Sequence, residues 1–318
     1  MVRFWSTWRR ARLTACLMLW SFAGIGMCAP ALAESSVLVL SSRDSSAYRQ
    51  VAESFQAFLQ NKLAGLEFVS VDLEDGSAAS QPRLTALEGK EFALIFALGS
   101  QATRLAAERY PRVPVVSSMV FSVADFDSLP NVTGIALEFP QETQLQWMRR
   151  LLPEANRIGV LFDPSQNQAW VDSARRVAER EGLELIPIAI GDATELPAGL
   201  KKLDRAADVL WAIPDKTVYS GKTLKQVLLS SFRSRIPVVG LSGAWVKAGA
   251  FYALDRDYRD LGRQSGAIAK RLLAGASPAA VKPETPKAVV YSLNLKTARH
   301  MKVTIEDNLQ AGAVHAYE

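Results

Sequence analysis

Short apolar runs that alternate with amphipathic helical patterns are the feature that most constrains how this chain folds. Residues 37–40 form the first run, and a segment follows in which Tyr48, Val51 and Phe55 recur at spacings of three and four. Runs of the same kind recur at residues 66–71, 92–98, 113–116, 131–137, 157–162, 185–190, 209–213, 236–239, 250–254 and 288–293. Strands that are apolar throughout belong to parallel sheets when helices separate them. We therefore predict an α/β fold.

The series of strand and helix patterns begins anew near Asn131. The chain contains no low-complexity segment and no repeat of fixed period, so what recurs is one architecture used twice. This organisation predicts two α/β lobes, each built on a parallel sheet.

Residues 1–33 have the three parts of a secretory signal peptide. Four arginines and no acid occupy residues 1–12, an uncharged apolar run covers residues 13–28, and Ala31-Leu32-Ala33 provides an A-x-A site. We predict cleavage after Ala33 and export to the periplasm. The apolar run is shorter than the roughly 18 residues expected of a membrane-spanning helix, and an uncleaved N-terminal anchor is the alternative.

The predicted leader also carries most of the charge. It holds four of the charges behind the formal net charge of +5, together with both cysteines, Cys16 and Cys28. A nearly neutral remainder lacks the basic surface that nucleic-acid binding requires, so we expect no nucleic-acid partner. Without cysteines there is no disulfide framework and no thiol nucleophile. Since His300 and His315 lack metal-binding spacing, we expect no metal and no cofactor.

Small polar residues gather directly after the predicted strands of both halves. In open parallel sheets, ligands bind outside the carboxyl ends of the strands, where helix N-termini offer N–H groups to anions. Hydroxyl and amide side chains there would orient a ligand, and Asp215 would pair with a ligand ammonium. Capping of a helix without any ligand is the alternative for each position. The predicted ligand contacts are Ser41, Ser42, Gly99, Ser100, Ser117, Ser118, Ser165, Gln166, Asn167, Asp215, Thr217 and Ser242.

One motif points toward an enzyme. Residues 240–244 (GLSGA) approximate the G-x-S-x-G nucleophile elbow, and Asp255 or Asp257 and then His300 follow Ser242 in the order Ser, Asp, His. The stretch after Ser242 is too short and too broken by glycine for the helix that an elbow requires. We therefore expect no catalytic residue and no enzyme, and an exported serine hydrolase is the least favoured alternative.

Two tryptophans, Trp170 and Trp245, follow strand-end loops. A ring in such a position stacks on a ligand, meets a partner or packs under the loop. These alternatives remain open at the level of the sequence.

From Asn131 onward the chain resembles the ABC-transporter substrate-binding protein family that includes tryptophan- and tyrosine-binding lipoproteins. The order and spacing of several segments carry the resemblance. They are NVTG at 131–134, RIGVLFDPSQN at 157–167, IPDKTV at 213–218, IPVVG at 236–240, DYRDLGRQSG at 257–266 and NLKTA at 294–298.

This resemblance implies a type I periplasmic-binding-protein fold, in which three hinge strands join two Rossmann-like lobes. The expected crossings lie near Ile135 to Glu138, near Ala250 to Asp255 and near Ser292. They give an N-terminal lobe of residues 34–136 and 255–291 and a C-terminal lobe of residues 137–254 and 292–318.

The resemblance also bears on the ligand contacts. Asn167, Asp215 and Thr217 match family positions that face the ligand, and Ser165 and Gln166 border them. The loops at residues 41–46 and 118–122 depart from the family pattern, so the resemblance supplies no contacts from the N-terminal lobe. Lys216 stands where an uncharged amide is common, which favours a more acidic ligand.

The implied function is that of a periplasmic solute-binding protein. It would bind a small polar ligand, amino-acid-like or a small organic acid, and deliver it to an ABC permease in the inner membrane. We expect a monomer. A sensory subunit that presents its ligand-bound form to a membrane receptor is the alternative on the same fold.

Overall fold

The computed structural model describes residues 35–73 and 82–318. The predicted signal peptide therefore lies outside the described residues. Within them, no helix is long and apolar enough to span a membrane.

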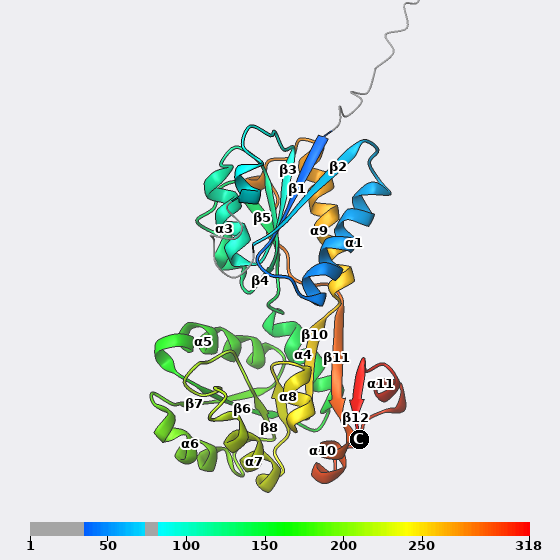
Figure 1. The fold of residues 1–318 in the computed structure, drawn as a ribbon. Coiled ribbons are helices and arrows are strands. Elements are labelled where there is room, and N and C mark those ends of the chain that lie inside the picture. The colour runs from blue at the N-terminus through cyan, green and yellow to red at the C-terminus, as the bar shows by residue number, and fades with distance from the viewer. Residues whose placement is uncertain (1–34, 74–81) are drawn as a thin grey trace, which may run out of the picture. The chain divides into compact units, whose positions relative to one another are not determined.

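The first sheet, as far as the structure describes it, has five parallel strands in the order β2-β1-β3-β4-β5 (Figure 1). Every residue of β3 is buried, as the unbroken apolar run predicts. The strands are β1 (Ser35–Ser41), β2 (Leu66–Asp72), β3 (Leu94–Leu98), β4 (Val115–Val120) and β5 (Val132–Ala136).

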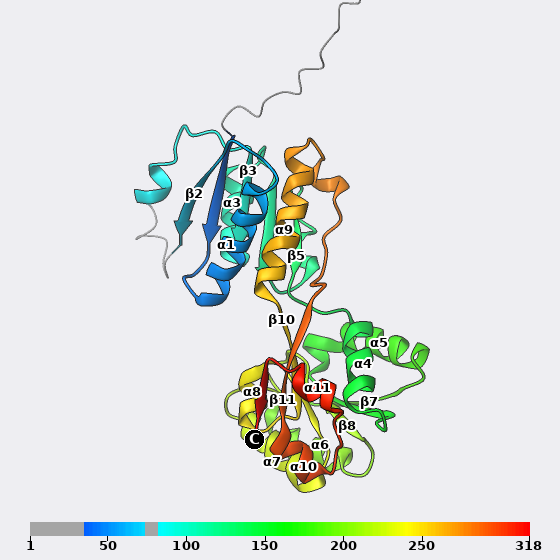
Figure 2. The same cartoon turned by 90° about the vertical axis from the view of Figure 1, so that its right-hand side faces the viewer.

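Helices cover both faces of this sheet. α1 (Ser46–Gln60) and α9 (Tyr258–Leu273) lie side by side on one face, and α3 (Ser100–Arg109) packs on the other (Figures 1 and 2). Two glycines allow the close approach of α9 to α1. A Cβ at Gly262 would lie 2.5 Å from the carbonyl oxygen of Val51, and one at Gly266 would lie 2.6 Å from the Phe58 ring. A helix from late in the sequence thus completes the first lobe.

The second sheet has seven strands within the described residues, in the order β12-β11-β10-β9-β8-β6-β7. β10 and β11 pair antiparallel, and the other neighbours pair parallel. The strands are β6 (Arg157–Phe162), β7 (Glu184–Ala189), β8 (Val209–Trp211), β9 (Val238–Gly240), β10 (Tyr252–Arg256), β11 (Val289–Asn294) and β12 (His315–Tyr317).

Two apolar clusters lie on opposite faces of the second sheet, since Val160 and Phe162 belong to one and Leu161 to the other. α4 and α5 contribute to the first cluster, and α6 and α7 to the second. The helices are α4 (Gln141–Leu151), α5 (Pro164–Arg180), α6 (Leu196–Leu203), α7 (Leu224–Ser234), α8 (Gly243–Ala248), α10 (Leu295–Met301) and α11 (Asp307–Ala311), with 3₁₀ turns at Val123–Phe126, Ala193–Glu195 and Pro278–Ala280.

The chain connects the two sheets at three places within the described residues. It runs from β5 to α4, from β10 to α9, and from a bridge between Ile135 and Glu284 to β11. The two parallel-dominated sheets confirm the predicted fold class. The predicted lobe boundaries stay a prediction. β10 extends to Arg256 and β11 begins at Val289, both within the second sheet.

Two local expectations differ from the structure. The fourth strand continues through Ser117 and Ser118 to Val120, because both serines are buried in the sheet and do not end it. The segment after Ser242 forms a helix, α8, although one of only six residues. It stops at Gly249, whose φ of 127° does not continue a helix.

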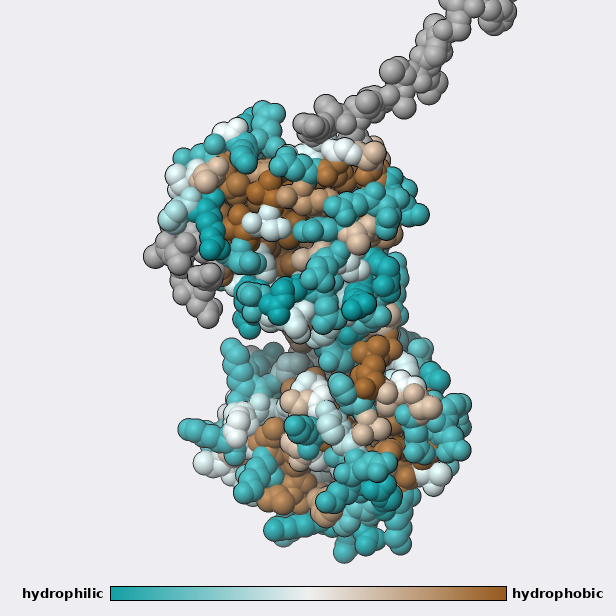
Figure 3. Space-filling view, turned by 45° about the vertical axis from the view of Figure 1, so that its right-hand side comes forward, coloured by the Kyte–Doolittle hydropathy of each residue, from teal (hydrophilic) through white to brown (hydrophobic). Residues whose placement is uncertain are grey.

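Hydrophilic side chains make up much of the face drawn in Figure 3, and hydrophobic areas show between them in the part formed by each sheet. The large hydrophobic side chains that are exposed include Phe121, Val123, Leu229, Phe232 and Val314. Apolar residues in scattered positions are normal on a protein surface and do not by themselves mark a binding site.

Candidate ligand-binding site

The polar residues that follow β6 and β8 form one hydrogen-bonded group around Asp215. The Asp215 carboxylate is buried, with the residue 5% exposed, and it accepts four hydrogen bonds. The donors are the backbone N–H of Asp163 at 2.7 Å, Asn167 Nδ2 at 2.8 Å, and the backbone N–H groups of Thr217 at 3.0 Å and Val218 at 2.9 Å. A carboxylate has about four acceptor positions, so the protein itself fills them all.

Asp163 is held in the same manner. Its carboxylate accepts from Ser165 N and Oγ at 2.9 and 2.7 Å, from Gln166 Nε2 at 2.8 Å and from Thr217 Oγ1 at 2.7 Å. The hydrogen bonds from Ser165, Thr217 and Gln166 hold the pKa of Asp163 well below its usual range, although desolvation acts in the opposite direction. We refer to Asp163, Ser165, Gln166, Asn167, Asp215 and Thr217 as the carboxylate network.

The carboxylate network brings together five of the twelve predicted ligand contacts, but their polar groups face one another. Asn167 Nδ2 is also 3.1 Å from the carbonyl oxygen of Pro214, and Gln166 Nε2 donates to Thr217 Oγ1 at 2.9 Å. The network joins the ends of two parallel strands that are neighbours in the sheet. Its observed role is to fix the two loops, and contact with a ligand stays a prediction.

The predicted contacts from the first sheet also serve local structure. Ser41 Oγ donates to the carbonyl oxygen of Arg43 at 2.8 Å. Ser42 Oγ accepts the backbone N–H of Ala102 at 2.9 Å, so this hydroxyl caps the start of α3. Gly99 has a φ of 89°, and a Cβ there would lie 2.7 Å from Ser42 Oγ, so glycine permits this close packing.

Ser117 and Ser118 are fully buried. Ser117 Oγ lies 2.6 Å from Thr103 Oγ1, whereas no hydrogen-bond partner for Ser118 Oγ occurs among the described residues. The next residue, Met119, has a φ of 61°, and the register of β4 with β5 shifts between Ser117 and Val120. A positive φ is uncommon for a residue other than glycine, so Met119 and the shift in register show that the end of β4 is irregular.

Ser100 and Ser242 are the predicted contacts whose hydroxyls reach the surface without a hydrogen bond in the described part of the chain. Ser100 is exposed at the first position of α3, and Ser242 is half-buried before α8. The groups expected to act with Ser242 in a hydrolase are engaged elsewhere. The His300 ring stacks on Phe232 with a centroid distance of 3.5 Å, and Asp257 caps α9 through the N–H groups of Arg259 and Asp260.

A cavity of about 200 Å³ lies between the loops after β8 and β9, the segment at residues 137–139 and the end of β10. None of the twelve predicted contacts, all of which are described residues, lines it. We refer to it as the hinge cavity. Its lining residues are Phe121, Leu137, Glu138, Phe139, Gln144, Trp170, Ala212, Ile213, Pro214, Val239, Gly240, Leu241, Leu254 and Arg256.

Arg256 is the cation of the hinge cavity. It is the last residue of β10, and its side chain is 19% exposed. Its Nε donates to the carbonyl oxygen of Leu137 at 2.7 Å, and the guanidinium carbon lies 4.8 Å from the centroid of the Phe139 ring. Burial lowers the pKa of Arg256, while the charges of Asp255, Tyr258 and Glu138 act in the opposite direction.

The terminal nitrogens of Arg256 retain unused donors. Nη1 is 3.8 Å from Asp255 Oδ1, which is too long for a hydrogen bond. Within residues 35–73 and 82–318, no hydrogen bond from Nη1 or Nη2 is formed. Asp255 Oδ1 instead accepts the backbone N–H of Arg256 at 2.8 Å and the hydroxyl of Tyr258 at 3.3 Å. The guanidinium is thus held by the hydrogen bond from Nε, whereas Nη1 and Nη2 are available to bind another group.

Aromatic surfaces and one acid complete the hinge cavity. Trp170 packs edge-on against Trp211 with ring centroids 4.9 Å apart, and Trp211 Nε1 donates to Gln144 Oε1 at 3.1 Å. Trp170 therefore both packs and lines a cavity, whereas Trp245 packs edge-on against Tyr219. Glu138 lines the same cavity. No sequence motif marks Arg256 or Glu138, but both lie beside the predicted crossings.

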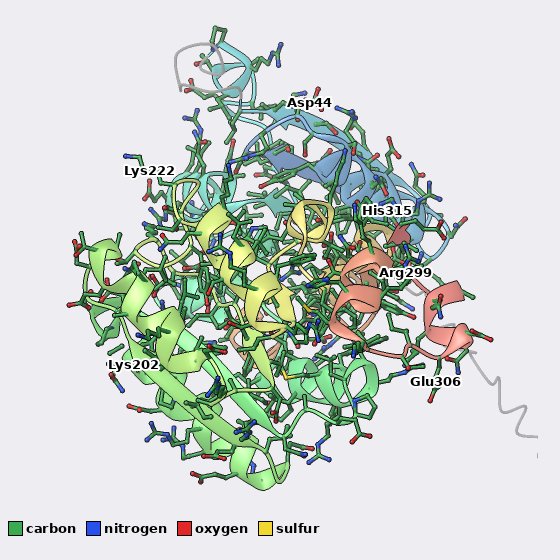
Figure 4. The ribbon with its side chains drawn as sticks, turned by 90° about the horizontal axis from the view of Figure 1, so that it is seen from below. Asp44, Lys202, Lys222, Arg299, Glu306 and His315 are labelled. Atoms are coloured by element: carbon green, nitrogen blue, oxygen red, sulfur yellow. The ribbon has the colours of Figure 1, made fainter. Side chains whose placement is uncertain are left out.

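Other hollows lie on the outer faces of the helices. One of about 510 Å³ between α6 and α7 includes Lys201 and Lys222, and one of about 670 Å³ along α7, α8 and α10 includes Leu229 and Phe232. Figure 4 shows Lys202, Lys222 and Arg299 at the outside of the molecule, where all three are exposed. Water screens such charges. The hinge cavity differs because its cation is partly buried, so a bound anion would interact with it more strongly.

Comparisons with known proteins agree with the fold. A substrate binding protein with adhesive properties from Clostridium difficile, in its ligand-free, open structure, superimposes with a TM-score of 0.74 at 18% identity over 89% of this chain and 99% of that one. The ABC domain in complex with L-Trp from Streptococcus pneumonia gives a TM-score of 0.56 at 20% identity over 89% of this chain and 100% of that one. These likenesses confirm the type I periplasmic-binding-protein fold.

Sequence comparison leads to the same family. The tyrosine-binding protein of Clostridioides difficile (strain R20291) is 23% identical over 193 residues, which are 58% of this chain and 55% of that protein. The chain thus aligns with about half the length of that relative. An uncharacterized protein of Rickettsia prowazekii (strain Madrid E) is 22% identical over 218 residues, 68% of this chain and 69% of its own length. The model of the family described as ABC transporter substrate binding protein matches residues 67–316, and the chain belongs to this family.

Proposed function

We propose that this protein binds an aromatic amino acid, or a closely related small carboxylate, in the hinge cavity and delivers it to an ABC permease for import. The observation that carries the proposal is the combination of Trp170 and Phe139 with the charges of Arg256 and Glu138 around one small cavity. Ligand sites combine apolar and aromatic walls with a few polar groups that orient the ligand. An amino acid with an aromatic side chain presents both kinds of surface.

The relatives support the class of ligand. One binds tyrosine according to its name, and one was solved with L-tryptophan. We extend these ligands to the present chain because its cavity holds aromatic residues together with one cation and one anion. The polar strand ends are secondary in this proposal. Among them, Ser100 and Ser242 are best suited to add ligand contacts, because their hydroxyls reach the surface without a protein partner in the described residues.

In the proposed mechanism no bond is broken. Ligand stabilises a closed arrangement of the two lobes over an open one by contacting both, and the permease recognises the closed arrangement. We place this event in the periplasm, after removal of residues 1–33, and propose that the protein acts as a monomer. The lining of the hinge cavity by residues beside two of the inter-sheet connections would link ligand binding to lobe closure.

A ligand screen tests the proposal. We expect L-tryptophan or L-tyrosine to raise the melting temperature of the purified protein, since a ligand that binds the native state stabilises it by mass action. Small-angle scattering should show that the protein becomes more compact with the same ligand. Native mass spectrometry of the protein as purified would identify a retained ligand. If no amino acid or small organic acid shifts the melting temperature, the proposed function is wrong.

A further inference from the structure

Arg256 differs from the other charged side chains of the described residues in one respect. Protein groups contact one side of its guanidinium, and the hinge cavity borders the other side. Leu137 anchors Nε, Phe139 lies under the guanidinium plane, and the hinge cavity borders the rest. Nη1 and Nη2 are not among the buried atoms that lack a partner, so water reaches them, and these donors can exchange that water for an anion that enters the cavity. Arginine presents its terminal nitrogens as a rigid fork that matches the two oxygens of a carboxylate.

The neighbouring acids do not fill that role. Asp255 is directed to the backbone N–H of Arg256 and to Tyr258, and its distance from Nη1 is 3.8 Å. Glu138 lines the hinge cavity, contributes a favourable charge to Arg256 and forms no hydrogen bond to the guanidinium. The fork is therefore held at a fixed place by its surroundings, with the positions for a bidentate anion still open.

We propose that Arg256 is the specificity-determining residue for the ligand's carboxylate, with Glu138 placed to receive a ligand ammonium. The proposal rests on the proposed function and deepens it, because it predicts which part of the ligand is indispensable. A ligand without a carboxylate is rejected, since the guanidinium would lose water on closure and gain no anion in return. A ligand without an ammonium is tolerated better, because water still reaches the half-buried Glu138.

The test compares ligands that differ in one charge. L-tryptophan, L-tryptophanamide, tryptamine and indole-3-propionate are titrated by calorimetry into the wild type and into Arg256→Gln, Arg256→Lys and Glu138→Gln. In the wild type, L-tryptophanamide and tryptamine should bind roughly 10- to 100-fold more weakly than L-tryptophan. Arg256→Gln should weaken the binding of L-tryptophan by a similar factor. In this variant L-tryptophan and L-tryptophanamide should bind with similar affinity.

Two further variants separate the charge of Arg256 from its shape and from the charge of its neighbour. Arg256→Lys keeps the charge but loses the fork, so it should retain part of the preference for a carboxylate. Glu138→Gln removes a charge of opposite sign from the same cavity, so it should weaken the binding of L-tryptophan, which has an ammonium, without weakening the binding of indole-3-propionate, which has none. Because the comparison of acid with amide in the wild type needs no substitution, the proposal stays testable even where Arg256→Gln fails to fold.

The outcomes for Arg256 and for the proposed function are distinguishable. If L-tryptophan binds equally well to wild type and Arg256→Gln, or if the amide binds the wild type as tightly as the acid, the assignment of Arg256 is overturned and the function survives. If indole-3-propionate binds through Arg256 but L-tryptophan and L-tyrosine do not, the assignment stands and the amino-acid ligand is wrong. If no carboxylate binds, both are overturned.

Discussion

The carboxylate network, which follows β6 and β8, and the hinge cavity, which reaches the end of β10, both contain charged side chains but differ in hydrogen bonding. Every acceptor position of Asp215 is occupied by a donor of the protein. The terminal nitrogens of Arg256 form no hydrogen bond among the described residues, and Nη1 has only a long ion pair with Asp255 Oδ1 at 3.8 Å. A satisfied buried group holds structure together, whereas an open one beside a cavity is free to bind a ligand. The number of hydrogen bonds, more than polarity or position, separates the two regions.

The largest effect is expected from Asp215→Ala. This change leaves four donors without their acceptor, and we expect a loss of about 3 kcal/mol or more in the free energy of unfolding. Urea unfolding measures it, with Asp204→Ala as the control because Asp204 is exposed in the same lobe. Affinity for L-tryptophan below the melting temperature should stay nearly unchanged. A collapse of affinity with normal stability would instead make Asp215 a ligand contact, as its position in the sequence predicts.

Trp170→Ala should lower the affinity for L-tryptophan more than it lowers stability, the reverse of what we expect for Asp215→Ala. The ring lines the hinge cavity, so its loss should weaken binding of L-tryptophan about 10-fold, which corresponds to about 1.4 kcal/mol. Calorimetry checks the affinity, and Trp170→Phe should recover part of it. Trp147→Ala is the matched control, since Trp147 packs on Tyr291 at 4.8 Å and does not line the cavity. Equal losses from both substitutions would contradict a ligand contact by Trp170.

A smaller effect is expected from Thr217→Val. It removes one donor to Asp163, the hydroxyl at 2.7 Å, and leaves the other donors in place. We expect about 1 kcal/mol less stability and no change in affinity. Thr304→Val, at an exposed position, is the control for the change from hydroxyl to methyl. Lower affinity for L-tryptophan at unchanged stability would show that the Thr217 hydroxyl serves the ligand.

The smallest effect is expected from Asp163→Asn, in how the melting temperature of the variant depends on pH compared with that of the wild type. Because hydrogen bonds hold the folded-state pKa of Asp163 below its unfolded value, the carboxylate stabilises the fold at neutral pH. That contribution is lost as the pH falls below about 4 and through the folded-state pKa. The melting temperature of the variant should therefore fall less steeply than that of the wild type between about pH 5 and pH 2. Parallel curves for the variant and the wild type would contradict this role.

The fold was more predictable from sequence than the site, for a physical reason. Runs such as residues 92–98 are apolar throughout because they are buried on both faces, and that constraint is local and visible in the sequence. The role of Asp215 depends on donors from residues 163, 167, 217 and 218, which no local pattern reveals. A Ser, Thr or Asn after a strand can cap a helix or bind a ligand, and the sequence alone does not distinguish the two roles.

The hinge cavity was harder still to predict. Arg256 meets Leu137 and Phe139, more than a hundred residues earlier in the chain, and only the fold brings them together. The sequence did contain one indication of this cavity. Glu138 is the last residue of the crossing expected near Ile135 to Glu138, and Arg256 directly follows the crossing expected near Ala250 to Asp255. In our proposal the charged residues at these crossings contact the ligand, whereas hydroxyls at strand ends such as those of Ser42 and Thr217 form hydrogen bonds within the protein.

The packing of α9 on α1 has a consequence for the order of folding. Close contact at Gly262 and Gly266 makes α9 half of the helical cover on one face of the first sheet. That face stays partly uncovered until residue 273 has been synthesised, after five of the seven described strands of the second sheet. The lobe that begins the chain therefore completes this face only after most of the second lobe has been made, and the core of the second lobe in turn waits for β11 and the helices that follow it. A growing chain thus stays incompletely folded for most of its synthesis.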